Sequence, residues 1–149
     1  MGVYAEGAYS TQELFKNYTA SILKAPAFQP TPDSKTLFLE SFRAYQYLAF
    51  GHKFIINIMD NLDWRFEGYI FQPFRAIVKQ ENKTASFGKD FDKRYLIGTS
   101  ALVYHTPLGP LSVSVNYYHN VPEVALADRS PFTFLFHFGY ILFNRKALD

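Results

Sequence analysis

One short stretch of this sequence comes close to the pattern of a catalytic serine. Gly98-Thr-Ser-Ala-Leu102 begins like the Gly-x-Ser-x-Gly turn that presents a serine nucleophile between a strand and a helix. The second glycine is replaced by Leu102, no helical pattern follows, and the stretch lies inside an expected strand. Asp90 and Asp92 stand in a hydrophilic loop that is typical of solvated surface. We therefore expect no catalytic residue in this chain.

The histidines do not form a metal-binding pattern either. The four are His52, His105, His119 and His137, and no two of them have the spacing of a metal site. The chain has no cysteine, which excludes thiolate ligands and disulfides. It also has no phosphate-binding loop. We expect neither a metal nor a cofactor.

The composition narrows the class of protein. The chain has 149 residues, enough for one domain, and 19% of them are aromatic, with 16 Phe and 11 Tyr. Its mean hydropathy is nevertheless −0.11. The sequence has no apolar run of about 18 residues, so no membrane-spanning helix is expected. The net charge of +2 comes from mixed signs without a basic patch, so nucleic acid is not an expected partner. Strands that alternate between lipid-facing and lumen-facing residues would produce such a composition.

Period-2 alternation and turn residues predict seven strands. The expected strands are 3–10, 17–25, 45–58, 62–74, 94–106, 111–119 and 132–144. The clearest alternation separates an apolar row from a polar row: Leu62, Trp64 and Phe66 against Asp63, Arg65 and Glu67. At the end of the chain, aromatic residues or Leu occupy every second position from Phe132 to Leu142. These faces predict an all-β fold: the C-terminal portion of an antiparallel up-and-down transmembrane β-barrel, with about seven strands and incomplete.

The connections between the expected strands alternate in length. Short links near 11–16, 60–61 and 107–110 all fall on one side of the wall. Long links at 26–44, 77–93 and 120–131 fall on the other. Outer-membrane barrels have short periplasmic turns and longer extracellular loops. We therefore expect a bacterial outer-membrane location, with lipid around the wall.

Seven strands that end on the short-turn side must begin on the opposite side. A single-chain bacterial barrel has an even number of strands and starts from the periplasm. We therefore expect residues 1–149 to lack upstream strands, so that the open edges are closed by upstream sequence or by a second copy of the chain. The start, Met1–Glu6, has no leader pattern, so the expected export signal also lies upstream.

Several segments together resemble a known family of barrels. They are Asn17-Tyr-Thr-Ala20, Ala25-Pro-Ala-Phe28, Phe42-Arg-Ala-Tyr45, Thr106-Pro-Leu-Gly-Pro-Leu111 and the closing strand 134–142. The pattern resembles the C-terminal barrel of bacterial patatin-like phospholipases, in the surface-antigen superfamily that includes barrel-assembly and two-partner secretion translocators. The likeness covers nearly the whole chain. It implies that an upstream patatin-like lipid acyl hydrolase domain carries the Ser/Asp dyad, and that this segment is not the enzyme.

The resemblance implies a lumenal ion pair. In the superfamily, an arginine from a long loop folds back into the lumen and pairs with an acidic residue of a neighbouring strand. Arg43 is similar to that arginine, with Ala44 where the family usually has Gly, and Glu67 is similar to its partner. The alternative is that Arg43 is a solvated loop charge, while Glu67 pairs with Arg65 or Lys53.

The closing strand resembles the signal that is read by the barrel assembly machinery, which is then an expected partner. The residues of this signal are Phe134, Phe136, Phe138, Gly139, Tyr140 and Leu142. The chain departs from the pattern by ending in polar residues 144–149 in place of a terminal aromatic. The same aromatics also suit a lipid-facing belt.

The function expected from these observations is a membrane segment that anchors or exports an upstream patatin-like domain. A second hypothesis is a soluble β-barrel whose apolar face holds an apolar ligand. A third is an enzyme fragment that uses lumenal polar residues such as Arg65 and Glu67. A requirement for detergent separates the first two, and turnover of a lipid ester would support the third.

Overall fold

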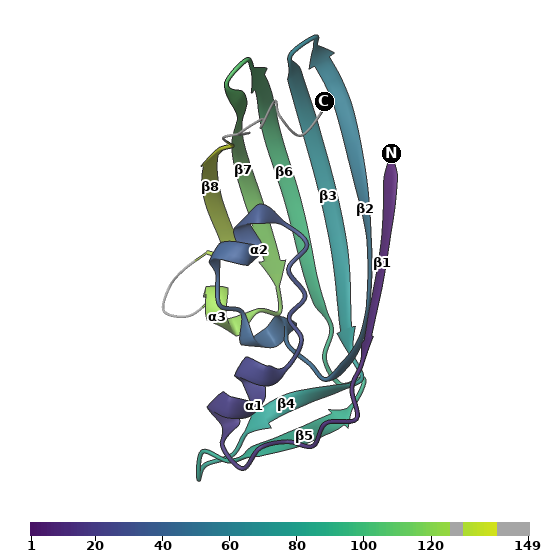
Figure 1. Cartoon of the computed structure of the whole chain (residues 1–149), viewed down its shortest axis with the longest axis vertical. Helices are drawn as coiled ribbons and strands as arrows, with labels where there is room; N and C mark the ends of the chain where they lie inside the picture. Colours follow the sequence, from purple (N-terminus) through teal and green to yellow (C-terminus); the bar gives the residue numbers. More distant parts are fainter. Residues whose placement is uncertain (126–129, 140–149) are drawn as a thin grey trace, which may run out of the picture.

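The computed structural model describes residues 1–125 and 130–139, and the chain is mostly antiparallel β-sheet. Six strands form the main sheet in the order β1-β2-β3-β6-β7-β8 (Figure 1). They are β1 (Gly2–Tyr9), β2 (Gln46–Met59), β3 (Leu62–Pro73), β6 (Tyr95–Thr106), β7 (Gly109–His119) and β8 (Phe132–Phe138). The expected all-β antiparallel fold is confirmed. The sheet is not closed into a barrel, because β1 and β8 are its two edges.

The tight turns and the long connections lie at opposite ends of this sheet (Figure 1). Tight turns at residues 60–61 and 107–108 join β2 to β3 and β6 to β7. Gly109 follows the second turn with a φ of 139°, a backbone conformation that favours glycine. The connections β1–β2, β3–β6 and β7–β8 are longer and lie at the other end. The tight turns therefore lie together as predicted, but the expected short link at 11–16 is wrong, because these residues are part of the long connection from β1 to β2 at the other end.

The expected strand at residues 17–25 is wrong, because this segment forms helix α1 (Tyr18–Lys24). Asn17 caps the helix: its side chain accepts a hydrogen bond of 2.8 Å from the Thr19 backbone N–H. Ile22 and Ala25, three residues apart, are buried together against Tyr45 and Ile77, which is the spacing of a helix face. Tertiary packing of this face overrides the β-rich local composition.

The loss of that strand reverses the direction of β1. β1 pairs directly with β2, and the connection between them is at the long-connection end. β1 therefore runs from the tight-turn end, not from the opposite end as seven strands predicted. β8 runs back toward the same tight-turn end.

The expected long loop at residues 77–93 contains a second, two-stranded sheet. Its strands are β4 (Arg75–Lys79) and β5 (Ala85–Asp90). Helix α1 lies against this hairpin beyond the long-connection end of the main sheet (Figure 1). The sequence therefore predicted a loop where the chain forms a hairpin that packs on α1.

The connection between β1 and β2 crosses one face of the main sheet (Figure 1). Besides α1, it contains α2 (Pro32–Thr36) and the short 3-10 helix η1 (Glu40–Phe42), and α3 (Pro122–Ala125) contacts η1. Thr31 and Ser34 cap α2 reciprocally. The largest buried cluster lies between this connection and the sheet, with Phe28 and Phe42 fully enclosed. We call residues 25–45 the plug, and the sheet face that it covers the inner face.

Candidate functional site

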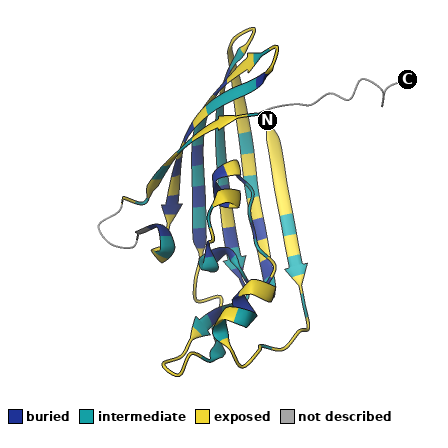
Figure 2. Cartoon of the chain, turned by 60° about the vertical axis from the view of Figure 1, so that its left-hand side comes forward, coloured by how far each residue is buried: buried dark blue, intermediate teal, exposed yellow. Residues whose placement is uncertain are grey.

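The outer face of the main sheet is apolar and exposed. Along much of the main sheet, exposed residues alternate with buried or half-buried ones (Figure 2), although the start of β1 and the end of β2 are exposed on both faces. Phe134 and Phe136 of β8 are 76% and 68% exposed, and Trp64 of β3 is 40% exposed. The other large exposed apolar residues of this face include Val3, Leu48, Phe50, Phe54, Ile56, Ile70, Leu102, Tyr104, Val113, Val115, Tyr117, Phe132 and Phe138. No described segment covers these side chains.

The apolar part of the outer face has the height of a membrane. On β2 it extends from Leu48 to Ile58, interrupted only by His52. Ten residues of strand rise about 34 Å, or about 26 Å along the axis of a barrel whose strands tilt by about 40°. Outer-membrane barrels carry an apolar band of about 25 Å. At the long-connection end the face becomes polar, with Gln72 bonded to Arg94 at 2.9 Å.

The inner face is polar in the half that is nearer the tight turns. Lys53 pairs with Glu67 at 2.7 Å across β2 and β3. Asp63 is bound by the His105 ring at 2.7 Å and by Arg65 at 3.3 Å. These groups come from cross-strand neighbours that point to the same side of the sheet. This half resembles the wall of a polar lumen and contrasts with the apolar reverse of the same strands.

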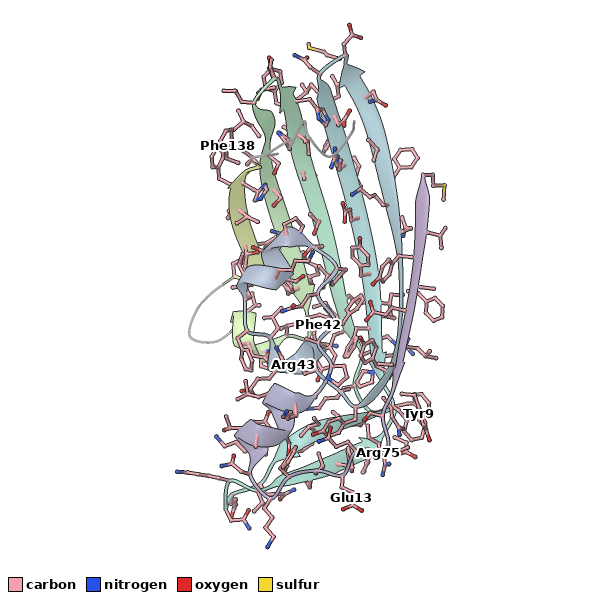
Figure 3. All side chains as sticks on the ribbon, in the orientation of Figure 1. Tyr9, Glu13, Phe42, Arg43, Arg75 and Phe138 are labelled. Carbon is pink, nitrogen blue, oxygen red and sulfur yellow. The ribbon has the colours of Figure 1, made fainter. Side chains whose placement is uncertain are left out.

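The plug covers the other half of the inner face with aromatic side chains. Phe28 stacks on Phe71 of β3, with ring centroids 5.4 Å apart, and Phe42 packs between Phe71 and Tyr95. Figure 3 shows Phe42 on the inner face beside the helices and Phe138 on β8 near the tight-turn end. Aromatic contacts of this kind stabilise a packed interface beyond simple burial. The plug is therefore part of the hydrophobic core of the sheet.

A buried carboxylate holds the plug to the far strands of the sheet. Asp33 of α2 accepts hydrogen bonds of 2.6 Å from Tyr118 of β7 and from Thr133 of β8. Glu123 of α3 likewise accepts from the Ser41 hydroxyl at 2.7 Å. Neither contact could be predicted from the sequence, because the partners are 82 to 100 residues apart and no local pattern links them.

Arg43 and Glu67 have different partners in the described part of the chain. The Arg43 guanidinium donates to the carbonyl oxygens of Ile22, Leu23 and Ala25, at 3.3 to 3.5 Å, where α1 ends. It also lies over the Phe38 ring at 4.7 Å, and burial lowers the pKa of the Arg43 guanidinium. Glu67 pairs with Lys53 and accepts from the Tyr69 hydroxyl at 2.8 Å.

Arg43 thus joins the plug to the end of α1. A cation near the last carbonyl groups of a helix satisfies acceptors that have no partner within the helix and interacts favourably with the helix dipole. Ala44, which follows, is fully buried, and its N–H bonds to the Pro26 carbonyl at 3.3 Å. The arginine therefore fixes the position of α1 relative to the segment that enters β2.

We expect Arg43→Ala to lower the melting temperature of the folded protein more than Lys83→Ala does. Arg43→Ala removes three hydrogen bonds to α1, a loss of about 1–3 kcal/mol. The Lys83 side chain is exposed, and we expect its loss to change the free energy of unfolding by about 0.5 kcal/mol or less. Thermal unfolding of both variants in the same detergent makes the comparison, and equal shifts would contradict this role of Arg43.

The expected assembly-signal residues divide between described and undescribed parts of the chain. Phe134, Phe136 and Phe138 lie on the outer face of β8. The Gly139 N–H donates to the Pro110 carbonyl at 2.9 Å, which ties the end of β8 to the start of β7. Tyr140 and Leu142 lie outside the described residues.

The groups that could do chemistry are dispersed. Ser100 lies on the outer face, where its hydroxyl accepts a 3.0 Å hydrogen bond from the Trp64 indole. Within residues 1–125 and 130–139, no three His, Asp or Glu side chains are grouped as a metal site. None of the helices in the same residues is long and apolar enough to span a membrane.

Comparisons with known proteins found no match: no family model, no curated protein and no solved structure is similar to this chain.

Proposed function

We propose that this chain is part of the wall of a bacterial outer-membrane β-barrel, with its outer face against lipid and its inner face toward a plugged lumen. The observation that carries the proposal is the apolar outer face, which continues across all six strands of the main sheet while their inner face holds ion pairs. A bilayer is the environment that stabilises so much exposed apolar surface on one side of a sheet.

The positions of the connections support the same proposal. Both tight turns lie at one end of the sheet, and the long connections with the plug and the β4–β5 hairpin lie at the other. Outer-membrane barrels place short turns in the periplasm and long loops outside. In this orientation β1 begins and β8 ends on the periplasmic side.

We also propose that the barrel anchors or exports a patatin-like lipid acyl hydrolase domain that precedes it, and that the barrel assembly machinery inserts it through β8. This part of the proposal is supported by the resemblance of the segments 42–45, 106–111 and 134–142. The sequence of the reading frame ahead of Met1 tests it. A Gly-x-Ser-x-Gly turn and an export signal there would support it, and a frame without either would contradict it.

Trp64, the single tryptophan of the chain, offers a direct test of lipid contact. We expect Trp64 fluorescence to be quenched strongly when the protein is reconstituted into phosphatidylethanolamine and phosphatidylglycerol vesicles that contain lipids with brominated acyl chains. The physical reason is that the indole lies on the outer face and is 40% exposed.

A second variant controls for quenching from the lumen. Trp64→Phe/Ser112→Trp moves the tryptophan to the inner face of β7, and we expect much weaker quenching from it. If the protein were a soluble barrel that holds an apolar ligand, brominated lipid would leave Trp64 unquenched. The protein would also stay monodisperse without detergent. That result would replace the membrane proposal.

A further inference from the structure

Two glycines form the floor of a depression in the outer face. Gly68 of β3 and Gly98 of β6 are direct cross-strand neighbours on that face. A Cβ at Gly98 would meet no atom within 4 Å, and one at Gly68 would lie 3.2 Å from the His52 ring. Glycine weakens a strand and often marks a place where a ligand approaches the backbone closely. The pair therefore indicates a binding surface.

The depression has a volume of about 410 Å³, and its walls are mostly apolar. Phe66 and Ser100 close it toward the tight turns, and Tyr117 and Phe132 line it on the side of β7 and β8. The Trp64 indole donates to Ser100 at 3.0 Å, and its ring lies 4.7 Å from that of Phe66. Trp64 therefore lies at the closed end of the depression.

An arginine lies at the edge of the outer face, on the long-connection side of the depression. Arg94 directly precedes β6 and is four residues from Gly98, about 14 Å along the strand. Its Nε donates to the Gln72 side chain at 2.9 Å, and Gln72 donates to the Lys93 carbonyl at 2.8 Å. Among residues 1–125 and 130–139, no carboxylate pairs with Arg94. The terminal nitrogens of its guanidinium can therefore bind a ligand that carries negative charge.

His119 of β7 supplies a second donor beside this arginine. It is the cross-strand neighbour of Leu96, which is two residues from Arg94 on the same face. The His119 Nδ1 lies 3.3 Å from the Tyr117 hydroxyl. When that hydroxyl donates, the ring proton is on Nε2, which can donate to an oxygen of a ligand. We call Arg94 and His119 the donor pair.

We propose that the outer face binds one phosphate-bearing lipid at the donor pair and the depression. The proposal rests on the membrane function proposed above. The lipid phosphate binds Arg94 and His119, and one acyl chain follows β6 past Leu96 into the depression at Gly98. Arginine binds phosphate through two parallel N–H bonds, and basic side chains at a membrane surface attract anionic lipids.

The order of the two features along β6 matches the order of groups in a lipid. The donor pair lies where the outer face becomes polar, and the depression lies about 14 Å further along the strand, within the apolar band. A headgroup at the interface and a chain in the hydrocarbon have the same order. A soluble phosphate ester would occupy the donor pair alone and leave the depression empty.

Brominated lipids test this site, because Trp64 lies at the closed end of the depression. The protein is reconstituted into phosphatidylcholine vesicles that contain equal fractions of either brominated phosphatidic acid or brominated phosphatidylcholine. The phosphate of phosphatidic acid is unsubstituted, whereas choline neutralises that of phosphatidylcholine. We expect the quenching of Trp64 to show at least about five-fold tighter binding of phosphatidic acid. Inorganic phosphate, compared with chloride at equal ionic strength, should leave this preference in place.

Two variants separate a lipid site from general attraction of anionic lipid. Arg94→Gln removes the charge, and Gly98→Leu fills the depression, where open space admits a side chain. We expect either change to reduce the preference for phosphatidic acid to less than about two-fold. The controls are Lys89→Gln, which removes an exposed cation of the β4–β5 hairpin, and Val113→Phe, which adds bulk to the outer face outside the depression. Both should keep the preference.

Equal quenching of the wild-type protein by the two brominated lipids would overturn the lipid site while leaving the membrane function in place. An unchanged preference in Gly98→Leu would also overturn it, because charge alone would then attract the lipid. Loss of the preference in inorganic phosphate would show an anion site that holds no acyl chain, with the same consequence. Quenching by neither lipid would end both proposals.

Discussion

Val113→Arg is expected to destabilise the membrane-inserted protein by about 2–4 kcal/mol, the cost of an arginine on the lipid face of a barrel near the bilayer midplane. Val113 is 51% exposed on the outer face of β7, between Leu102 of β6 and Phe136 of β8. The measurement is the free energy of unfolding in phosphatidylcholine vesicles by denaturant titration. A water-soluble sheet would tolerate an arginine at such an exposed position.

Ser112→Arg is the matched control, because Ser112 is the preceding residue on the same strand and points to the inner face. There the new guanidinium reaches water and the row that contains Asp63, so we expect a change of less than about 1 kcal/mol. The pair separates the two faces with one chemical change. Equal costs, or a larger cost at Ser112, would show that lipid does not cover the outer face.

Phe28→Ala is expected to cost about 3–5 kcal/mol of unfolding free energy, because it removes a fully buried ring and leaves a cavity. Phe28 is the centre of the contact between the plug and the sheet, with rings from Phe42, Tyr47, Tyr69 and Phe71 around it. The stacked partner, Phe71, belongs to β3, so the variant weakens the plug and the wall together.

Denaturant unfolding in detergent measures this effect, with Phe15→Ala as the control. Phe15 precedes α1, is 39% exposed and lies outside the aromatic cluster. We expect its loss to cost about 1 kcal/mol or less. A small effect of Phe28→Ala would mean that the plug leaves the inner face in solution.

The plug gives the inner face two different halves. Aromatic side chains fill the half toward the long connections, and the half toward the tight turns keeps the Lys53–Glu67 pair and the Asp63 cluster. Because Asp33 bonds to both β7 and β8, the plug is also attached to the edge strand that a barrel must close. The position of the plug and the position of β8 are therefore coupled.

Much of the main sheet could be predicted because its signals are local. In β3, the alternation of Trp64 and Phe66 with Arg65 and Glu67 assigns each side chain to a face, whichever strand lies alongside. The tight turns at 60–61 and 107–108 were equally visible. The structure of residues 17–25 could not be predicted in this way, because either a helix or a strand could bury Ile22. The cap from Asn17 and the packing on Tyr45 and Ile77 selected the helix.

By itself, the sequence determined the two faces of clearly alternating strands such as β3, where the chain turns tightly at 60–61 and 107–108, and that no catalytic serine pattern is complete. Only the tertiary structure decided that β1 pairs directly with β2, that Arg43 binds the end of α1, and that Asp33 holds the plug. The physical reason is the separation along the chain of the residues that interact. Alternation depends on neighbours along the chain, whereas a charge or a hydrogen-bonding group takes whichever partner the fold brings within about 3 Å.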